Sequence, residues 1–198
     1  MKTSQVKVLL AVLTIFTALS FKNQVPYRTL MINNAESSID WSAKTKKGEH
    51  NGTIALKSGN ITFMGADITG GSFLIDMKSV TVSDIKAKDP DNEKLVKHMI
   101  GTEFFKSEQF ADARLDVSRV VKKSDGLFDI SAHLTLAGKT LPMPFEMRVT
   151  MADDRMIAET TLTVDCSKWG VIHEPIEIGK DFIDNVIILK LKMSANSR

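Results

Sequence analysis

The chain has 198 residues and a net charge of +2, from 26 Lys and Arg against 24 Asp and Glu. Nucleic-acid binding usually requires a basic surplus gathered on one face, so this balance excludes that class of partner. Cys166 is the single cysteine, so an internal disulfide is excluded and packing alone must hold the fold.

The first 20 residues are typical of a secretory signal peptide. A short basic lead is followed by an apolar run over residues 8–19, and Ala18 and Ser20 have the spacing of a cleavage site. A membrane-spanning helix is the alternative, but spanning needs about 20 apolar residues and this run is shorter. We therefore expect cleavage after Ser20 and a periplasmic or secreted protein whose mature form has no membrane span.

The mature chain is predicted to form one domain. We expect residues 21–36 to be an N-terminal lead-in, residues 37–194 a β-barrel domain and residues 195–198 a tail. From Ser37 onward apolar and polar residues alternate, which is the period of a strand with one buried face. A glycine pair, Gly70 and Gly71, indicates a bulge that lets the sheet curl.

About eight such strands, joined mostly by short turns, predict an all-β fold built as an antiparallel up-and-down barrel. A two-sheet sandwich is the runner-up. The clearest alternation runs over residues 141–151, where Met143, Phe145 and Met147 share one face. Methionine adapts its shape, so this face suits a wall around a flexible apolar ligand, although gap filling in an ordinary core explains it as well.

One helical segment interrupts the strands. Asp89 can cap its first turn, Pro90 suits the first helical position and Gly101 suits the stop, so we expect a helix over residues 90–100. Leu95 and Met99 share one face of that helix, which therefore needs an apolar surface to cover.

The aromatic residues that follow the helix extend the insertion to about residues 90–107. Phe104 and Phe105 are adjacent, which indicates insertion into a core. His98 lies near the carboxyl end of the helix, where the helix dipole favours a charged imidazole. It could contact a polar head group at a rim, but a solvent-facing cap is the simpler interpretation.

Residue patterns typical of enzymes and metal sites are absent from the sequence. It contains no nucleophile elbow, glycine-rich phosphate loop or pair of catalytic carboxylates. The only conceivable acid–base set for a lipid-modifying enzyme is His98, His133 and Asp165, and Cys166 is expected to be an inert thiol. We therefore expect no metal and no cofactor, because none of the four histidines forms a zinc-site pair with another: His50, His98, His133 and His173.

Seven motifs are spread along the chain in a fixed order: SIDW (38–41), HNGT (50–53), SG (58–59), GSFLIDMKS (71–79), LVKHMIGTEFF (95–105), LTLAGKT (134–140) and DCSKWG (165–170). In this order and spacing they resemble the YceI-like family of bacterial exported proteins over about residues 37–194. Cys166 departs from the pattern, since an arginine commonly follows the aspartate there, and residues 111–113 lack the proline often found after the aromatic Phe110.

The resemblance implies a lipocalin-like antiparallel barrel whose apolar tunnel binds a polyisoprenoid, such as a polyprenyl phosphate or an isoprenoid quinone. It implies a carrier or store of such a lipid rather than an enzyme. A lipid-modifying enzyme using the same cavity and a packed-core structural or interaction protein stay open as alternatives, as does a homodimer. The residues expected to contact the lipid are Trp41, Phe73, Ile75, His98, Phe104, Phe105, Leu134, Met143, Phe145 and Met147.

Overall fold

The computed structural model describes residues 25–46, 48–102, 104–152, 155–171 and 183–196. The expected signal peptide, its cleavage site after Ser20, and His173 lie outside the described residues. These residues form eleven strands, one α-helix and two short 3-10 helices: β1 (Tyr27–Ile32), η1 (Asn34–Glu36), β2 (Ser38–Lys44), β3 (Glu49–Thr53), β4 (Ala55–Met64), β5 (Asp67–Asp76), α2 (Pro90–Ile100), β6 (Asp112–Ser124), β7 (Leu127–Leu136), β8 (Lys139–Pro142), β9 (Phe145–Ala152), β10 (Arg155–Asp165), η2 (Cys166–Trp169) and β11 (Val186–Asn196).

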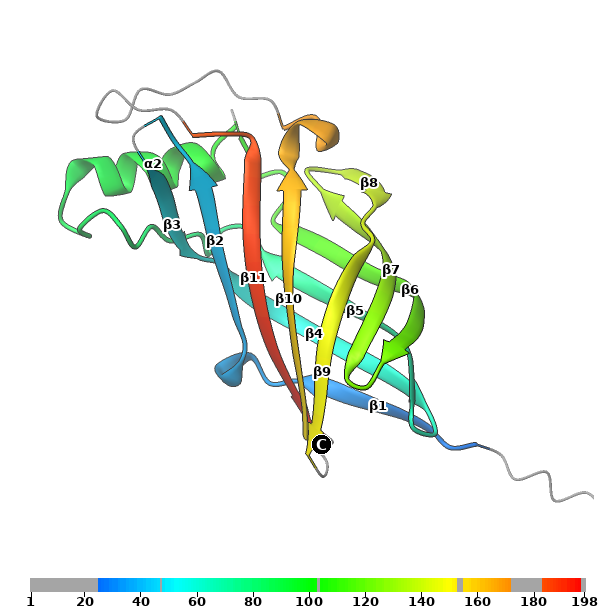
Figure 1. Cartoon of the computed structure of the whole chain (residues 1–198). Helices are drawn as coiled ribbons and strands as arrows, with labels where there is room; N and C mark the ends of the chain where they lie inside the picture. The colour runs from blue at the N-terminus through cyan, green and yellow to red at the C-terminus, as the bar shows by residue number, and fades with distance from the viewer. Residues whose placement is uncertain (1–24, 47, 103, 153–154, 172–182, 197–198) are drawn as a thin grey trace, which may run out of the picture.

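Eight of the strands close into an antiparallel barrel (Figure 1). Their order is β1-β4-β5-β6-β7-β9-β10-β11, and β11 returns to β1 through the pairs Met31 with Asn196 and Ile32 with Ala195. β2 and β3 continue the sheet beyond β11, and β8 pairs with β7 off the main path. The predicted eight-stranded barrel is therefore confirmed, and the closure excludes the two-sheet sandwich.

The barrel begins earlier in the chain than the sequence suggested. Residues 27–32 form β1, although they belong to the expected lead-in, and Leu30 is fully buried. Their sequence, YRTLMI, alternates poorly. Its strand character comes from pairing with residues 60–64 of β4, which a search for local alternation does not detect.

The long strand expected over residues 141–151 is broken in two. Pro142 and Pro144 have no backbone N–H to donate, so the regular ladder is interrupted around them, and only the Met143 N–H between them donates to β7, to the Ala132 carbonyl at 2.8 Å. β8 pairs with residues 133–136 of β7, whereas β9 pairs with residues 127–130 of the same strand. Met143 and Met147 are buried as the alternation predicts, but Met151 lies at the end of β9 and is exposed.

Helix α2 has the predicted bounds, Pro90–Ile100. The Asp89 carboxylate accepts a hydrogen bond from the Asp91 backbone N–H at 3.0 Å, which satisfies one of the free donors of the first turn. Leu95 and Met99 are buried as expected. Figure 1 shows α2 at the end of the barrel toward which the β2 arrow points, and we call this end of the barrel the helix end.

The opposite end is made by four segments that the strand register places together. They are the start of β1, the β4–β5 turn, the β6–β7 turn and the end of β9 (Figure 1). Tyr27 pairs with Met64, and Leu127 pairs with Arg148. We call this the hairpin end.

Candidate ligand cavity

An apolar cavity lies inside the barrel at the helix end, where about 520 Å³ of space, part of it open to solvent, surrounds the lining atoms and about 60 Å³ admits the centre of a water-sized sphere. We call it the helix-end cavity. Much of this space is too narrow to admit a water molecule. Fourteen residues line it, none of them charged: Trp41, Ile54, Ile75, Met77, Val80, Met99, Phe105, Ala113, Leu134, Leu136, Val164, Cys166, Ile187 and Leu189.

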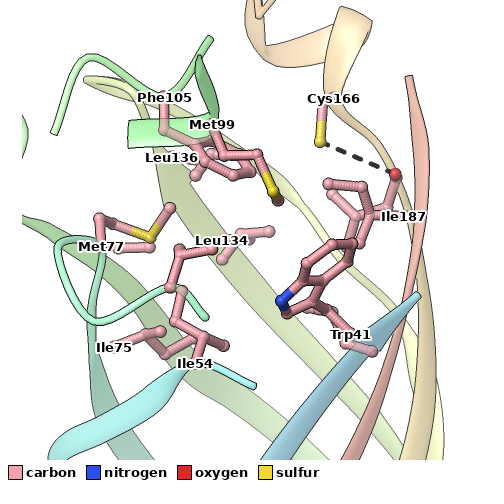
Figure 2. Close-up of a pocket in the computed structure, with 14 residues that line it drawn as sticks. Trp41, Ile54, Ile75, Met77, Met99, Phe105, Leu134, Leu136, Cys166 and Ile187 are labelled. Carbon is pink, nitrogen blue, oxygen red and sulfur yellow. Dashed lines mark hydrogen bonds between the residues drawn. The ribbon is translucent and has the colours of Figure 1, made fainter. Parts of the chain in front are cut away.

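Strand alternation supplies most of this wall, and the helical insertion supplies its cover. Ile75 on β5 and Leu134 on β7 point inward because successive strand residues face opposite sides of the sheet. Met99 from α2 and Phe105 from the following turn meet them from above in Figure 2. The cavity is therefore bounded by both the barrel wall and the insertion.

The polar groups near the cavity wall are satisfied within the protein. The Trp41 indole N–H donates to the Thr81 carbonyl at 2.9 Å. The Trp169 indole N–H likewise donates to the Leu134 carbonyl at 2.9 Å. Since these donors are occupied, the indole of Trp41 presents its apolar surface to the cavity.

The Cys166 thiol is buried and behaves as part of the apolar wall. It is 1% exposed, and its sulfur lies 3.9 Å from the Val164 carbonyl oxygen (Figure 2). Burial, together with the neighbouring Asp165 charge, raises the pKa of the thiol to about 12. The thiolate is the reactive form, so this environment supports the expectation of an inert thiol.

A second apolar cavity, the hairpin-side cavity, continues along the barrel with about 380 Å³ of space between its lining atoms. On β5, Ile75 lines the first cavity and Phe73, two residues away, lines the second, and Leu189 and Leu191 do the same on β11, so the two cavities follow each other along the barrel. The second cavity is also mostly narrower than a water molecule. Its lining residues are Ile61, Ile68, Gly70, Phe73, Leu115, Val117, Val120, Ile130, Phe145, Met147, Thr160, Leu191 and Met193.

The ten residues predicted to contact a lipid divide into three groups. Trp41, Ile75, Phe105 and Leu134 line the helix-end cavity. A second group, Phe73, Phe145 and Met147, lines the hairpin-side cavity. The remaining three are buried but line neither cavity: His98, Phe104 and Met143.

His98 is buried on the packed face of α2, so the expectation that it faces solvent is wrong. It is 7% exposed, and its ring lies 5.7 Å from that of Phe104. The physical reason is helical spacing, because residues 95, 98 and 99 are related by three and four positions and share one face. Phe104 is itself 1% exposed and packs edge-on against Phe105, at 4.4 Å between ring centroids.

Sequence reasoning missed several cavity residues. Met99 belongs to the apolar helix face that it identified, but was not assigned to the site. Ile187 and Leu189 lie on β11, whose alternation is visible in the sequence. Met77 and Val80 lie at or beyond the end of β5 and carry no periodic signal, so only the fold identifies them.

The alternative acid–base set does not come together. His98 is buried under α2, whereas His133 is exposed on β7 opposite Asp116 of β6. Asp165 ends β10, and its carboxylate accepts from the Ser167 hydroxyl. Among the described residues, no group of three or more His, Cys, Asp or Glu side chains could hold a metal ion.

The fold and its interior define the class of protein: a closed antiparallel barrel that encloses apolar cavities. The YceI-like domain matches residues 30–195, and the chain belongs to this family. Within the part of the chain that the structure describes, no helix is long and apolar enough to cross a membrane.

Relatives agree with this assignment. A UPF0312 protein of Vibrio parahaemolyticus is 27% identical over 134 residues, which cover 68% of each chain. BcnA of Burkholderia cenocepacia has a similar fold, with a TM-score of 0.68 and 14% identity over 83% of this chain and 99% of that one. A polyisoprenoid binding domain from Saccharophagus degradans, implicated in plant cell wall breakdown, gives a TM-score of 0.64 and 14% identity over 85% and 98% of the two chains.

Proposed function

We propose that the protein binds the tail of a long-chain polyisoprenoid inside the barrel and carries or stores it outside the cytoplasm. The observation that carries this proposal is the pair of apolar cavities aligned inside one closed barrel. Membership of the YceI-like family and the fold shared with a polyisoprenoid binding domain support it. The predicted signal peptide supports a periplasmic or secreted location.

The physical reason is the cost of exposing an isoprenoid tail to water. Each Å² of apolar surface removed from water contributes about 25 cal/mol, so a long tail gains much by entering a closed barrel. The residues that line the helix-end cavity include no charged side chain. We therefore infer that the protein recognises the tail, and that a phosphate or quinone head group stays outside this cavity.

Binding a long tail requires the barrel to widen, because both cavities are narrow. One part of the wall is suited to this movement. Residues 155–159 of β10 pair with β9, but residues 160–165 pair in the described structure only with β11. β8 likewise pairs with β7 alone. We call the boundary where residues 160–165 of β10 face the break between β8 and β9 the seam.

Side chains rather than a backbone ladder bridge the seam. The Thr160 hydroxyl donates to the Glu146 carbonyl at 2.6 Å. Nearer the helix end, the Lys139 ammonium donates to the Lys168 carbonyl at 2.6 Å. A few such bonds separate at lower cost than a continuous ladder, so we infer that the seam lets the interior expand around a tail.

The test is a fluorescence displacement assay with delipidated protein and either a polyprenol or an isoprenoid quinone. Ala113 is buried and lines the helix-end cavity, so Ala113→Phe should fill the space and lower affinity by about tenfold or more. The matched control is Ala55→Phe, which adds the same ring at an exposed position of β4.

Two results would overturn the proposal. The first is wild-type protein that binds neither polyprenol nor quinone. The second is a folded Ala113→Phe variant with unchanged affinity. If Ala113→Phe does not fold, Leu134→Phe provides the same test with a smaller increase in volume at another residue of the cavity wall.

A further inference from the structure

The exposed large apolar side chains of the described residues all belong to segments of the hairpin end. Tyr27 is 66% exposed, Met64 52% and Met151 44%. Val25 precedes β1, and Val121 lies near the end of β6. Scattered exposed apolar residues are ordinary in a soluble protein, whereas their concentration at one end indicates an interaction surface.

Three of these residues are contiguous. Tyr27 and Met64 are direct partners in the β1–β4 ladder. Val25 lies against Gly65 in the adjoining turn, close enough that its methyl group would be 2.9 Å from a Cβ added there. Together they form one apolar corner, and we call Val25, Tyr27, Met64 and Met151 the apolar rim.

The fourth member, Met151, lies near the end of β9 and lines the mouth of the barrel. This mouth is a depression with about 1000 Å³ of space, open to solvent, at the hairpin end. Phe63 and Ala66, which flank Met64 and Gly65 in the chain, line it too, so the apolar corner adjoins the mouth. Ile68 lines both this depression and the hairpin-side cavity, so the mouth leads towards the barrel interior.

The charges around the rim carry both signs. The Lys122 ammonium lies 3.6 Å from an Asp125 oxygen, an Arg155 nitrogen lies 2.7 Å from a Glu36 oxygen, and Arg148 lines the depression. Since both signs are present, the apolar side chains are the main basis on which this surface would recognise a partner. An exposed tyrosine among flexible apolar side chains suits a membrane interface, where the ring is buried and the hydroxyl meets water.

The order of the chain points to the same partner. The apolar run over residues 8–19 precedes Val25, with residues 20–24 between them. Before cleavage, the expected signal peptide is therefore joined to the chain at the hairpin end and not at the helix end.

We propose that the apolar rim docks on a lipid bilayer and that the adjoining mouth takes up the isoprenoid tail there. The uptake step rests on the proposed function, whereas docking can be tested without any isoprenoid. Tyr27, Met64 and Met151 insert into the interface, and binding depends little on anionic lipid. The helix end faces water.

The experiment is flotation of the mature protein with phosphatidylcholine vesicles, with and without phosphatidylglycerol. Wild-type protein should float with both kinds of vesicle. Met64→Asp/Met151→Asp should lower the vesicle-bound fraction by about tenfold or more, because two charges must then leave water. The matched control, Ser131→Asp/Thr163→Asp, adds two charges at exposed positions of β7 and β10 and should float as wild type does.

The outcomes separate the two proposals. Wild-type protein that stays in solution, or the same loss in both double variants, overturns docking. In the displacement assay with detergent-dispersed polyprenol, the single variant Met64→Asp should bind like wild type, since Met64 lines neither the interior cavities nor the depression at the mouth. Vesicle binding without any polyprenol or quinone binding would overturn the proposed function and leave docking supported.

Discussion

The two ends of the barrel differ in how they are covered. At the helix end, α2 and the following turn place Met99 and Phe105 over the helix-end cavity, and Phe104 is buried behind them. At the hairpin end, Tyr27 and Met64 are exposed beside an open depression. Strand alternation supplies both ends with an apolar interior. The difference therefore arises from what the connecting segments bring across each opening.

The helix end is also tied down by polar contacts. The segment after β5 passes alongside β3, where the Thr81 N–H donates to the Thr53 carbonyl at 2.9 Å. The His50 ring nitrogen lies 2.7 Å from an Asp84 carboxylate oxygen. These contacts hold the segment after β5 against β3 at the helix end.

The largest expected effect is a difference in stability between a variant at the helix end and a variant at the hairpin end. Phe104→Ala should lower the free energy of unfolding by about 3–5 kcal/mol, because it empties a site that is 1% exposed. Tyr27→Ala, at a site that is 66% exposed, should cost less than about 1 kcal/mol. Urea unfolding of both variants measures the difference. Equal losses would contradict the contrast between a packed end and an open end.

A second prediction concerns pH and the Cys166 thiol. Its pKa is raised from an ordinary value of 9.0 to about 12, so the native thiol keeps its proton in a range where the unfolded thiol loses it. Ionisation then favours the unfolded state, and the free energy of unfolding should fall by up to about 1.4 kcal/mol per pH unit above pH 9.0.

Cys166→Ala removes this contribution while leaving the other titrating groups in place. The free energies of unfolding of wild type and Cys166→Ala are measured by urea unfolding from neutral pH to pH 10.5, which is about the ordinary pKa of lysine. The difference between the two free energies should grow smaller as the pH rises. Parallel pH profiles for the two proteins would show that the thiol is not buried as the structure has it.

The smallest expected effect is local to the helix end. Asp89→Ala removes the cap of α2 and should cost about 1 kcal/mol, whereas Asp89→Asn keeps a capping oxygen and should cost much less. Hydrogen exchange should become faster in α2 and stay unchanged in the β6–β7 hairpin. Faster exchange at both ends would mean that the ends are not independent.

Local patterns predicted much of the fold. Alternation predicted the barrel strands, and Asp89, Pro90 and Gly101 predicted the bounds of α2. The resemblance added Phe104 and Phe105 as ligand contacts, and of these two Phe105 lines the helix-end cavity. The local patterns missed the break at Pro142 and Pro144, because they predicted one strand over residues 141–151. They failed for β1 because its strand character depends on pairing with β4, and for His98 because its neighbours on the helix face were not counted.

The sequence by itself determined which residues face the interior, because strand and helix periods fix the side of the element on which each side chain lies. Only the tertiary structure decided which of those residues border empty space. Met143 and Met147 share one face of the predicted strand, yet only Met147 lines a cavity. The tertiary structure alone also decided the apolar rim, because Tyr27 and Met64 are far apart in the chain and meet only when β1 pairs with β4.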